Sequence, residues 1–212
     1  MTHNNVFANP EIAYDYEIWY QTVGSQADKQ EKALLKRLLR VFSTADSILE
    51  IGCGTGHFTR WFSQQGMQAI GLDLSRPMLE EANRFGSSLL LKGGALKLPF
   101  SSNSFDIIAL ITTLEFLPNP IAVLCEVHRV ARQGLILGVL NTQSYLGRKY
   151  KRSKSPIWKA AKLFTPGELK QLIHQAVGEE AEIVWRTTLW PIWPASLPLP
   201  WGGFIGMAVN WK

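Results

Sequence analysis

A chain of 212 residues with 46% apolar and 18% charged residues has enough apolar side chains for one sizeable core, which excludes an intrinsically disordered protein. No apolar run approaches the roughly 20 residues of a membrane-spanning helix, and residues 1–10 lack the apolar stretch of a signal peptide. With two cysteines, Cys53 and Cys125, and a net charge of +5, the sequence predicts a cytoplasmic globular protein without a disulfide framework.

The first third of the chain predicts a β-α-β unit. Apolar residues recur every three or four positions over residues 26–42, which indicates an amphipathic helix. Residues 47–52 form a short expected strand that ends in glycine, followed by a helix over 56–65 and a second strand over 68–73. A third helix, from Ser75 to about Arg84, comes next.

The alternation of strands and helices continues to the end of the chain. Strands are expected over 89–91, 105–111 and 135–140, with helical periodicity between the last two, over 121–130. A capping box at 165–168 begins a helix that continues to Val177, and two last strands are expected over 182–189 and 204–211. This alternation favours a parallel sheet.

The loop after the first strand, Gly52-Cys53-Gly54-Thr55-Gly56, predicts a ligand site. Its glycines allow a sharp turn and a close approach to a bound molecule, and the following helix N-terminus favours an anionic ligand group. A dinucleotide-binding dehydrogenase needs a third glycine where this chain has His57, so that class is disfavoured. Asp73 ends the second strand, where a carboxylate binds ribose hydroxyls or, alternatively, only caps a helix.

Residues 48–56 (ILEIGCGTG) and 71–79 (GLDLSRPML) closely resemble the first two motifs of class I S-adenosylmethionine-dependent methyltransferases. The resemblance is to the small stand-alone enzymes related to ubiquinone- and menaquinone-type methyltransferases (type 11), and it spans roughly residues 14–175. It continues through residues 98–100, 104–106, 114–118 and 126–130. It implies a Rossmann-like, doubly wound α/β fold: a seven-stranded, mostly parallel sheet with an antiparallel last strand and helices on both faces.

The resemblance also implies a cofactor site for S-adenosylmethionine, with S-adenosylhomocysteine as the product. Asp73 is expected to bind the ribose, and Leu74 and Met78 to flank the adenine. Gly94 stands where the family commonly has an aspartate for the adenine amino group, so we expect the backbone of Ala95 to serve instead. The matching positions are Tyr14, Tyr16, Trp19, Glu50, Gly52, Cys53, Gly54, Gly56, Asp73, Leu74, Met78, Gly94, Ala95, Leu96 and Leu114.

Three segments are expected to complete a single domain over residues 1–212. Residues 1–25 resemble the lid of these relatives through Tyr16-Glu-Ile-Trp19, although the same aromatic residues also suit the anchor of an N-terminal helix. Residues 142–164 and 186–203 are expected acceptor-side insertions. The tryptophan- and proline-rich segment 185–201 is expected either to form, with residues 145–163, a pocket for an apolar or aromatic acceptor, or to be a dimer contact or a cap on the core. A monomer and a homodimer both stay open.

Methyl transfer from a sulfonium is an in-line displacement, so the protein mainly has to align donor and acceptor. A hydroxyl or thiol acceptor needs a base, and Glu115, at the end of the fourth strand, is the candidate, the alternative being a carboxylate that only hydrogen-bonds the backbone. His57 is expected to face the cofactor or water. The cysteines and histidines show no paired spacing of metal ligands, so no metal site is predicted.

The favoured function is S-adenosylmethionine-dependent methyl transfer to the O, S, N or C atom of a small molecule. Residues 112–115 (TTLE) differ from the Asn/Asp-Pro-Pro-aromatic motif of enzymes that methylate base amino groups, so nucleic acid is a disfavoured partner. Two hypotheses stay open beside it. One is methylation of a macromolecule held by the basic residues between Arg148 and Lys162, and the other is a non-catalytic sensor of S-adenosylmethionine.

Overall fold

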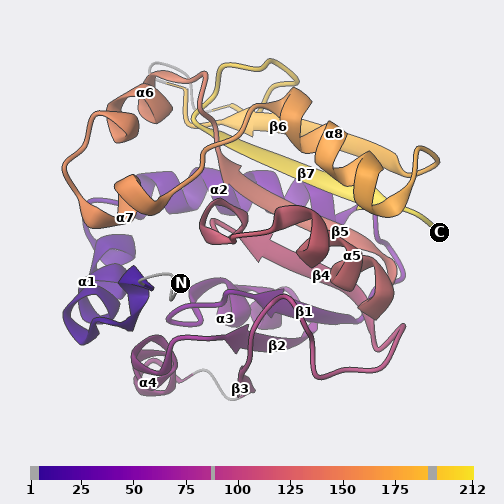
Figure 1. Ribbon diagram of the computed structural model, residues 1–212, viewed down its shortest axis with the longest axis horizontal. Coiled ribbons are helices and arrows are strands. Elements are labelled where there is room, and N and C mark those ends of the chain that lie inside the picture. The colour runs from indigo at the N-terminus through magenta and orange to yellow at the C-terminus, as the bar shows by residue number, and fades with distance from the viewer. Residues whose placement is uncertain (1–4, 87–88, 191–194) are drawn as a thin grey trace.

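The computed structural model describes residues 5–86, 89–190 and 195–212, and its centre is a seven-stranded sheet in the order β3-β2-β1-β4-β5-β7-β6 (Figure 1). β7 pairs antiparallel with β5 and β6, and the other neighbouring strands are parallel. This confirms the predicted α/β sheet with an antiparallel last strand. The strands are β1 (Ser47–Ile51), β2 (Gln68–Asp73), β3 (Leu90–Lys92), β4 (Phe105–Ile111), β5 (Ala131–Leu140), β6 (Glu182–Thr188) and β7 (Phe204–Asn210).

Helices cover both faces of the sheet, as expected (Figure 1). α2 and α3 pack on one face and α5 and α8 on the other, each around its own buried apolar cluster. No helix in the described ranges is both long and apolar enough to cross a membrane. The helices are η1 (Val6–Ala8), α1 (Pro10–Gln21), α2 (Ser25–Leu39), α3 (His57–Gln64), α4 (Arg76–Arg84), η2 (Leu114–Phe116), α5 (Pro120–Val130), α6 (Tyr145–Lys151), α7 (Pro156–Ala160) and α8 (Pro166–Val177).

Local sequence signals set most helix boundaries. The Ser75 hydroxyl accepts the Met78 N–H and caps α4, and Thr165 and Glu168 form the predicted reciprocal capping box of α8. β5 differs from the expectation, because it begins at Ala131 directly after α5 rather than at residue 135. The first residues of β5 include polar ones, and one of them forms an ion pair there: the Arg132 guanidinium donates to the Asp106 carboxylate at 2.8 Å.

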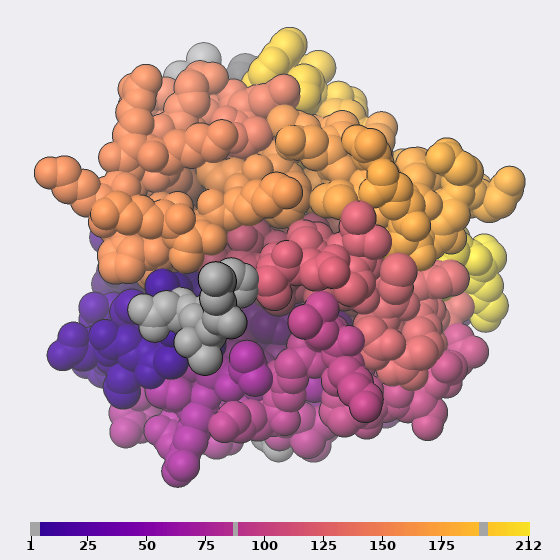
Figure 2. Space-filling view, in the orientation of Figure 1, coloured from indigo at the N-terminus to yellow at the C-terminus, as the bar shows by residue number. Residues whose placement is uncertain are grey.

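The carboxyl ends of the parallel strands position the candidate site. β1 lies between β2 and β4, where the chain order reverses, which is the usual ligand position in doubly wound sheets. α1, α6 and α7 gather at this edge of the sheet (Figure 1). In the space-filling view, the orange surface that contains α7 borders the indigo surface of α1 (Figure 2), and α6 lies beyond α7 (Figure 1).

Candidate functional site

The glycine loop after β1 has a backbone conformation that residues with a side chain rarely adopt. Gly52, Gly54 and Gly56 have φ angles of 70°, 53° and 73°, in the left-handed region where only glycine is unstrained. The Gly52 N–H donates to the Leu72 carbonyl at 2.7 Å, which fixes the loop to β2. A Cβ atom on Gly52 would lie 2.3 Å from the Thr113 methyl, so the loop also packs tightly against the end of β4.

Asp73 closes this loop from the end of β2. One carboxylate oxygen accepts the Gly54 N–H at 2.8 Å and the other accepts the Ser75 N–H at 2.7 Å. Burial raises the pKa of Asp73, although the N–H groups of Ser75 and Gly54 oppose the shift. Each oxygen retains a lone pair beyond these bonds, so the carboxylate organises the loop and can still accept from a ligand.

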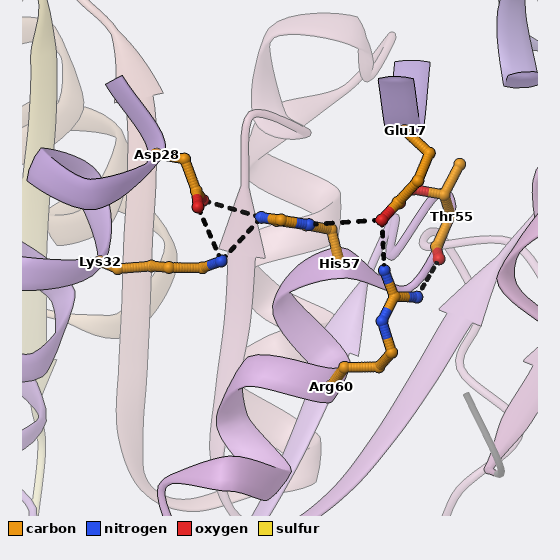
Figure 3. Close-up of polar contacts among 6 residues, drawn as sticks. All are labelled: Glu17, Asp28, Lys32, Thr55, His57 and Arg60. Atoms are coloured by element: carbon orange, nitrogen blue, oxygen red, sulfur yellow. Dashed lines mark hydrogen bonds and ion pairs between the residues drawn. The ribbon is translucent and has the colours of Figure 1, made fainter. Parts of the chain in front are cut away.

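Helix α1 lies against the glycine loop through Glu17, a residue that sequence reasoning did not assign to the site. Its carboxylate accepts the Thr55 hydroxyl at 2.5 Å and the Arg60 guanidinium at 2.6 Å (Figure 3). Burial opposes ionisation of Glu17, but hydrogen bonds from His57 and Thr55 and the charge of Arg60 lower its pKa overall. The signal was present as the acidic residue of the Tyr-acid-x-Trp segment.

His57 faces the helices rather than the cofactor side or water, which corrects the expectation. Its ring stacks on Tyr20 of α1, with the ring centres 3.8 Å apart. Its Nε2 atom lies 2.7 Å from the Asp28 carboxylate and 2.8 Å from the Lys32 ammonium of α2 (Figure 3). His57 therefore connects α3 with α1 and α2. The sequence does not predict this contact, because the position of a residue within a helix does not say which other helices pack against it.

Glu115, the candidate base, lies in η2 just beyond β4 and is only 2% exposed. Its Oε1 atom accepts the Leu140 N–H at 2.7 Å, and its Oε2 atom has no hydrogen-bond partner among the residues that the structure describes. Burial raises its pKa to about 7, against the opposing effect of the Leu140 N–H. Such an unsatisfied buried oxygen is rare in proteins and calls for an explanation.

Comparison with known proteins identifies this combination of loop, acid and sheet. Residues 49–138 match a family model described as a methyltransferase domain. A crystal structure from Thermotoga maritima, described as an S-adenosylmethionine-dependent methyltransferase and possible histamine N-methyltransferase, has a TM-score of 0.81 and 29% sequence identity, and the match covers 97% of this chain and 99% of that one. The chain belongs to the class I S-adenosylmethionine-dependent methyltransferases. The predicted family is confirmed.

Curated relatives add a partial match. Demethylmenaquinone methyltransferase of Lactiplantibacillus plantarum is 35% identical over 106 residues, which is 45% of this chain and 44% of the relative. An uncharacterised protein of Mycobacterium tuberculosis is 32% identical over 164 residues, 74% of this chain and 55% of the relative. The chain spans about half the length of the curated relatives it matches.

Several positions that the methyltransferase resemblance assigned to the adenine lie at the loop edge. Met78 is buried, and its sulfur lies 3.8 Å from where a Gly54 Cβ would be. Leu74 and Leu96 follow the neighbouring strands β2 and β3 and are 60% and 49% exposed. A Cβ on Gly94 would meet no atom within 4 Å, so the space beside it is open.

Three other predicted cofactor residues are packed among protein groups. The Glu50 carboxylate accepts the Thr59 hydroxyl of α3, and burial raises the pKa of Glu50 to about 8. Cys53 is buried beside Gly71, and burial raises the pKa of its thiol. Leu114 is fully buried in the core cluster on the α5 side. Their contribution to the cofactor site is the support of the glycine loop and the end of β4, and direct contact stays a prediction.

The aromatic residues of the expected lid occupy different places. The Tyr16 hydroxyl lies 3.4 Å from the Thr112 hydroxyl at the end of β4. Tyr14 is 54% exposed and lines a surface groove between α1 and α4. The Trp19 ring packs against Gly24, where a Cβ would lie 2.3 Å from it, so Trp19 holds the turn between α1 and α2.

The two expected acceptor-side segments contact each other at the edge of the sheet. Leu146 of α6 packs on Gly203. Asn141, just before the first segment, has an amide that donates to the Pro200 and Gly202 carbonyls at 2.6 and 2.8 Å. Trp185 lies in β6. Pro191, Trp193 and Pro194, which carried much of the prediction for this segment, lie outside the described residues. Within the described part of the chain, no three His, Cys, Asp or Glu side chains are grouped to hold a metal ion.

Proposed function

We propose that the chain binds S-adenosylmethionine over the glycine loop and transfers its methyl group to a small-molecule acceptor. One observation carries this proposal. Asp73 ties the left-handed glycine loop to the end of β2 at the point where the strand order reverses, and its oxygens keep lone pairs for ribose hydroxyls. The family to which the chain belongs supports the same donor.

The residues present fit this cofactor. Asp73 would accept from the ribose, the exposed Leu74 and Leu96 would contact the faces of the adenine, and the open space at Gly94 leaves the backbone of Ala95 accessible to its edge. The backbone of the glycine loop would hold the methionine part. When bound, S-adenosylmethionine supplies an electrophilic methyl group on a sulfonium centre.

The chain itself has two further tasks, to align the acceptor and to accept its proton. Glu17 and Tyr20 hold α1 against the glycine loop and the start of α3, which would place α1 beside a bound acceptor. Glu115 Oε2 has no hydrogen-bond partner among the described residues and lies near the ends of β4 and β5. The pKa of Glu115, about 7, suits a group that takes up a proton near neutral pH. We assign Glu115 the role of proton acceptor.

The test is calorimetric titration of S-adenosylhomocysteine into the wild type and Asp73→Asn. We expect Asp73→Asn to bind about 10- to 100-fold more weakly, because a charge-assisted hydrogen bond is worth about 1.5–3 kcal/mol. Since Asp73 also accepts two backbone N–H groups, its replacement should lower stability as well, which thermal melting would quantify.

Asp106→Asn is the matched control. Asp106 also accepts backbone N–H groups, those of Asp46 and Ser47, but it lies at the opposite end of the sheet. The Asp106→Asn variant should lose stability without losing affinity for S-adenosylhomocysteine. Equal affinities of wild type and Asp73→Asn would overturn the ribose assignment, and a wild type that does not bind would overturn the proposed function.

A further inference from the structure

Two buried carboxylates from distant parts of the chain lie within electrostatic range of each other. Glu31 of α2 is 5% exposed and Glu115 of η2 is 2% exposed. The Tyr16 hydroxyl lies 3.4 Å from the hydroxyl of Thr112, which shortly precedes Glu115 in the chain. The charge of Glu115 raises the pKa of Glu31, and both charges raise the pKa of Tyr16. Burial is the larger cause in each case.

Three tyrosines complete this group, which we call the carboxylate–tyrosine cluster: Tyr16, Tyr20, Tyr150, Glu31 and Glu115. The Tyr16 and Tyr20 rings of α1 meet edge to face with centres 5.5 Å apart. Tyr16 and Tyr150 of α6 both pack against the buried apolar cluster that contains Tyr20. Burial is the main cause that raises the pKa of Tyr20 and of Tyr150, and the charge of Glu31 adds to it.

The cluster adjoins the glycine loop through two consecutive residues at the end of β4. The Tyr16 hydroxyl lies 3.4 Å from the Thr112 hydroxyl, and the Thr113 hydroxyl donates to the Gly52 carbonyl at 3.2 Å. An acceptor molecule held in the cluster would therefore lie next to the loop that we propose for the methyl donor.

The described residues do not balance the charge of the cluster. Glu115 Oε2 has no hydrogen-bond partner in these ranges, and the charge of Lys32 opposes the raised pKa of Glu31. Lys32 is the nearby cation, but its ammonium already lies 2.8 Å from both Asp28 and His57. Buried carboxylates without partners either hold protons or bind a cation.

We propose that the carboxylate–tyrosine cluster is the acceptor site and that it selects a small amine. Ammonium N–H groups would donate to Glu31 and Glu115, and the tyrosine rings would face the cation. A phenol or thiol acceptor, by contrast, would become a further anion beside two carboxylates. This inference rests on the proposed methyl transfer and names its substrate class.

The transfer balances with groups already present. The ammonium gives one proton to Glu115 Oε2, which leaves a neutral amine. The nitrogen lone pair then forms the bond to the methyl carbon while the carbon–sulfur bond breaks, and that electron pair stays on sulfur. The product is a methylammonium, whose positive charge Glu31 stabilises. The pKa values of about 8 for Glu31 and about 7 for Glu115 allow such proton exchange near neutral pH.

The experiment compares amines with their hydroxyl analogues on the wild-type protein saturated with S-adenosylhomocysteine. Calorimetry with 2-phenylethylamine and 2-phenylethanol, and with a panel of similar aliphatic and aromatic pairs, measures recognition without turnover. We expect the amines to bind at least about 10-fold more tightly, as one charge-assisted pair provides. Mass spectrometry after incubation with S-adenosylmethionine should then show methylated amines.

Glu31→Gln tests the residue assignment, with Glu81→Gln as control because Glu81 is a mostly buried carboxylate of α4 away from the cluster. Glu31→Gln should lose about 10-fold in amine affinity and keep its affinity for S-adenosylhomocysteine. Equal or weaker binding of amines by the wild type overturns the inference even if the variant fails to fold. If S-adenosylhomocysteine binds and only the hydroxyl compounds react, the amine inference fails alone, whereas absence of that binding means that the proposed function has failed.

Discussion

The cofactor half of the site, residues 47–96, and the acceptor half, the carboxylate–tyrosine cluster, are held together in different ways. In the cofactor half the contacts of Asp73 stay within one β-α-β unit and join it to Ser75 and to Gly54, 19 residues earlier. In the acceptor half they join distant segments, such as Tyr16 of α1 with Thr112 after β4. Local motifs therefore specify the first half, and tertiary packing specifies the second.

The two halves also differ in how far the chain satisfies its own polar groups. Both oxygens of Asp73 accept backbone N–H groups, so protein groups alone hold the loop in place. Glu115 has one oxygen without a partner in the described residues. A site whose polar groups are already hydrogen-bonded suits a cofactor that is the same in all relatives. A site with an unsatisfied acceptor suits the substrate, which varies among relatives.

The largest expected effect comes from a single methyl group in the cofactor half. Gly52→Ala places a Cβ 2.3 Å from the Thr113 methyl at a φ of 70°. We expect a loss of about 2–5 kcal/mol in the free energy of unfolding, from left-handed strain and from overpacking, measured by urea denaturation.

Gly66→Ala separates these two causes. Gly66 has a φ of 90°, but a Cβ there would meet no atom within 4 Å, so only the strain of about 1–2 kcal/mol remains. If both variants lose the same stability, the glycine loop is not tightly packed against β4, and the contrast between a rigid cofactor half and an open acceptor half disappears.

The same contrast explains what could be predicted from the sequence. The β1–α3–β2 unit, the capped α4 and the position of Asp73 follow from glycine spacing, hydrophobic period and capping residues that act over one or two turns. Glu31 carries no such local signal, and Glu17 carries only that of the Tyr-acid-x-Trp segment, residues 16–19. They become site residues only because α1 and α2 fold back onto the carboxyl edge of the sheet.

Two further differences have physical reasons. The helices α6 and α7, of seven and five residues, contain too few turns for a hydrophobic period to be recognised. His57 follows a glycine loop typical of ligand sites, yet the first turn of α3 directs its ring toward Tyr20 and Asp28. The spacing of the sequence predicts that His57 follows the loop, but it does not predict toward which residues its ring points.

A smaller effect, on the pH dependence of stability, would sharpen the account of the acceptor half. The folded pKa of Glu31 is about 8, against an ordinary value of 4.5, so between pH 5 and 8 the folded protein holds a proton that the unfolded chain has released. Stability must then fall as the pH rises. Glu31→Gln should reduce this fall by about 3–4 kcal/mol, measured by urea denaturation at pH 5 and pH 8.

Glu80→Gln is the control, because Glu80 is an exposed partner of Arg76 on α4 and should leave the pH dependence unchanged. Glu115 and Glu50, with folded pKa values of about 7 and about 8, keep part of the fall in every variant. The same slope in Glu31→Gln and wild type would mean that Glu31 is ionised in the folded protein and that the cluster has a cation of its own.

The smallest expected effect concerns Glu17, which joins α1 to the cofactor half. Its lowered pKa means that its stabilising contacts are present above its ordinary pKa of 4.5 and are lost as the pH falls through the folded value. Glu17→Gln should weaken the bonds to Thr55 and Arg60 and raise local opening of α1 about 10-fold, measured by hydrogen exchange of residues 10–21 at pH 7.

Glu11→Gln, an exposed position in the first turn of α1, should leave this exchange unchanged. The strands β4 and β5 should keep their protection in both variants, because opening of α1 does not unfold the sheet. Protection of α1 in the wild type should also decline below pH 4.5, once exchange rates are corrected for intrinsic chemistry, and Glu17→Gln should lack that decline. If β4 loses protection together with α1, the two halves open as one unit, and α1 does not act as a separate cover over the glycine loop.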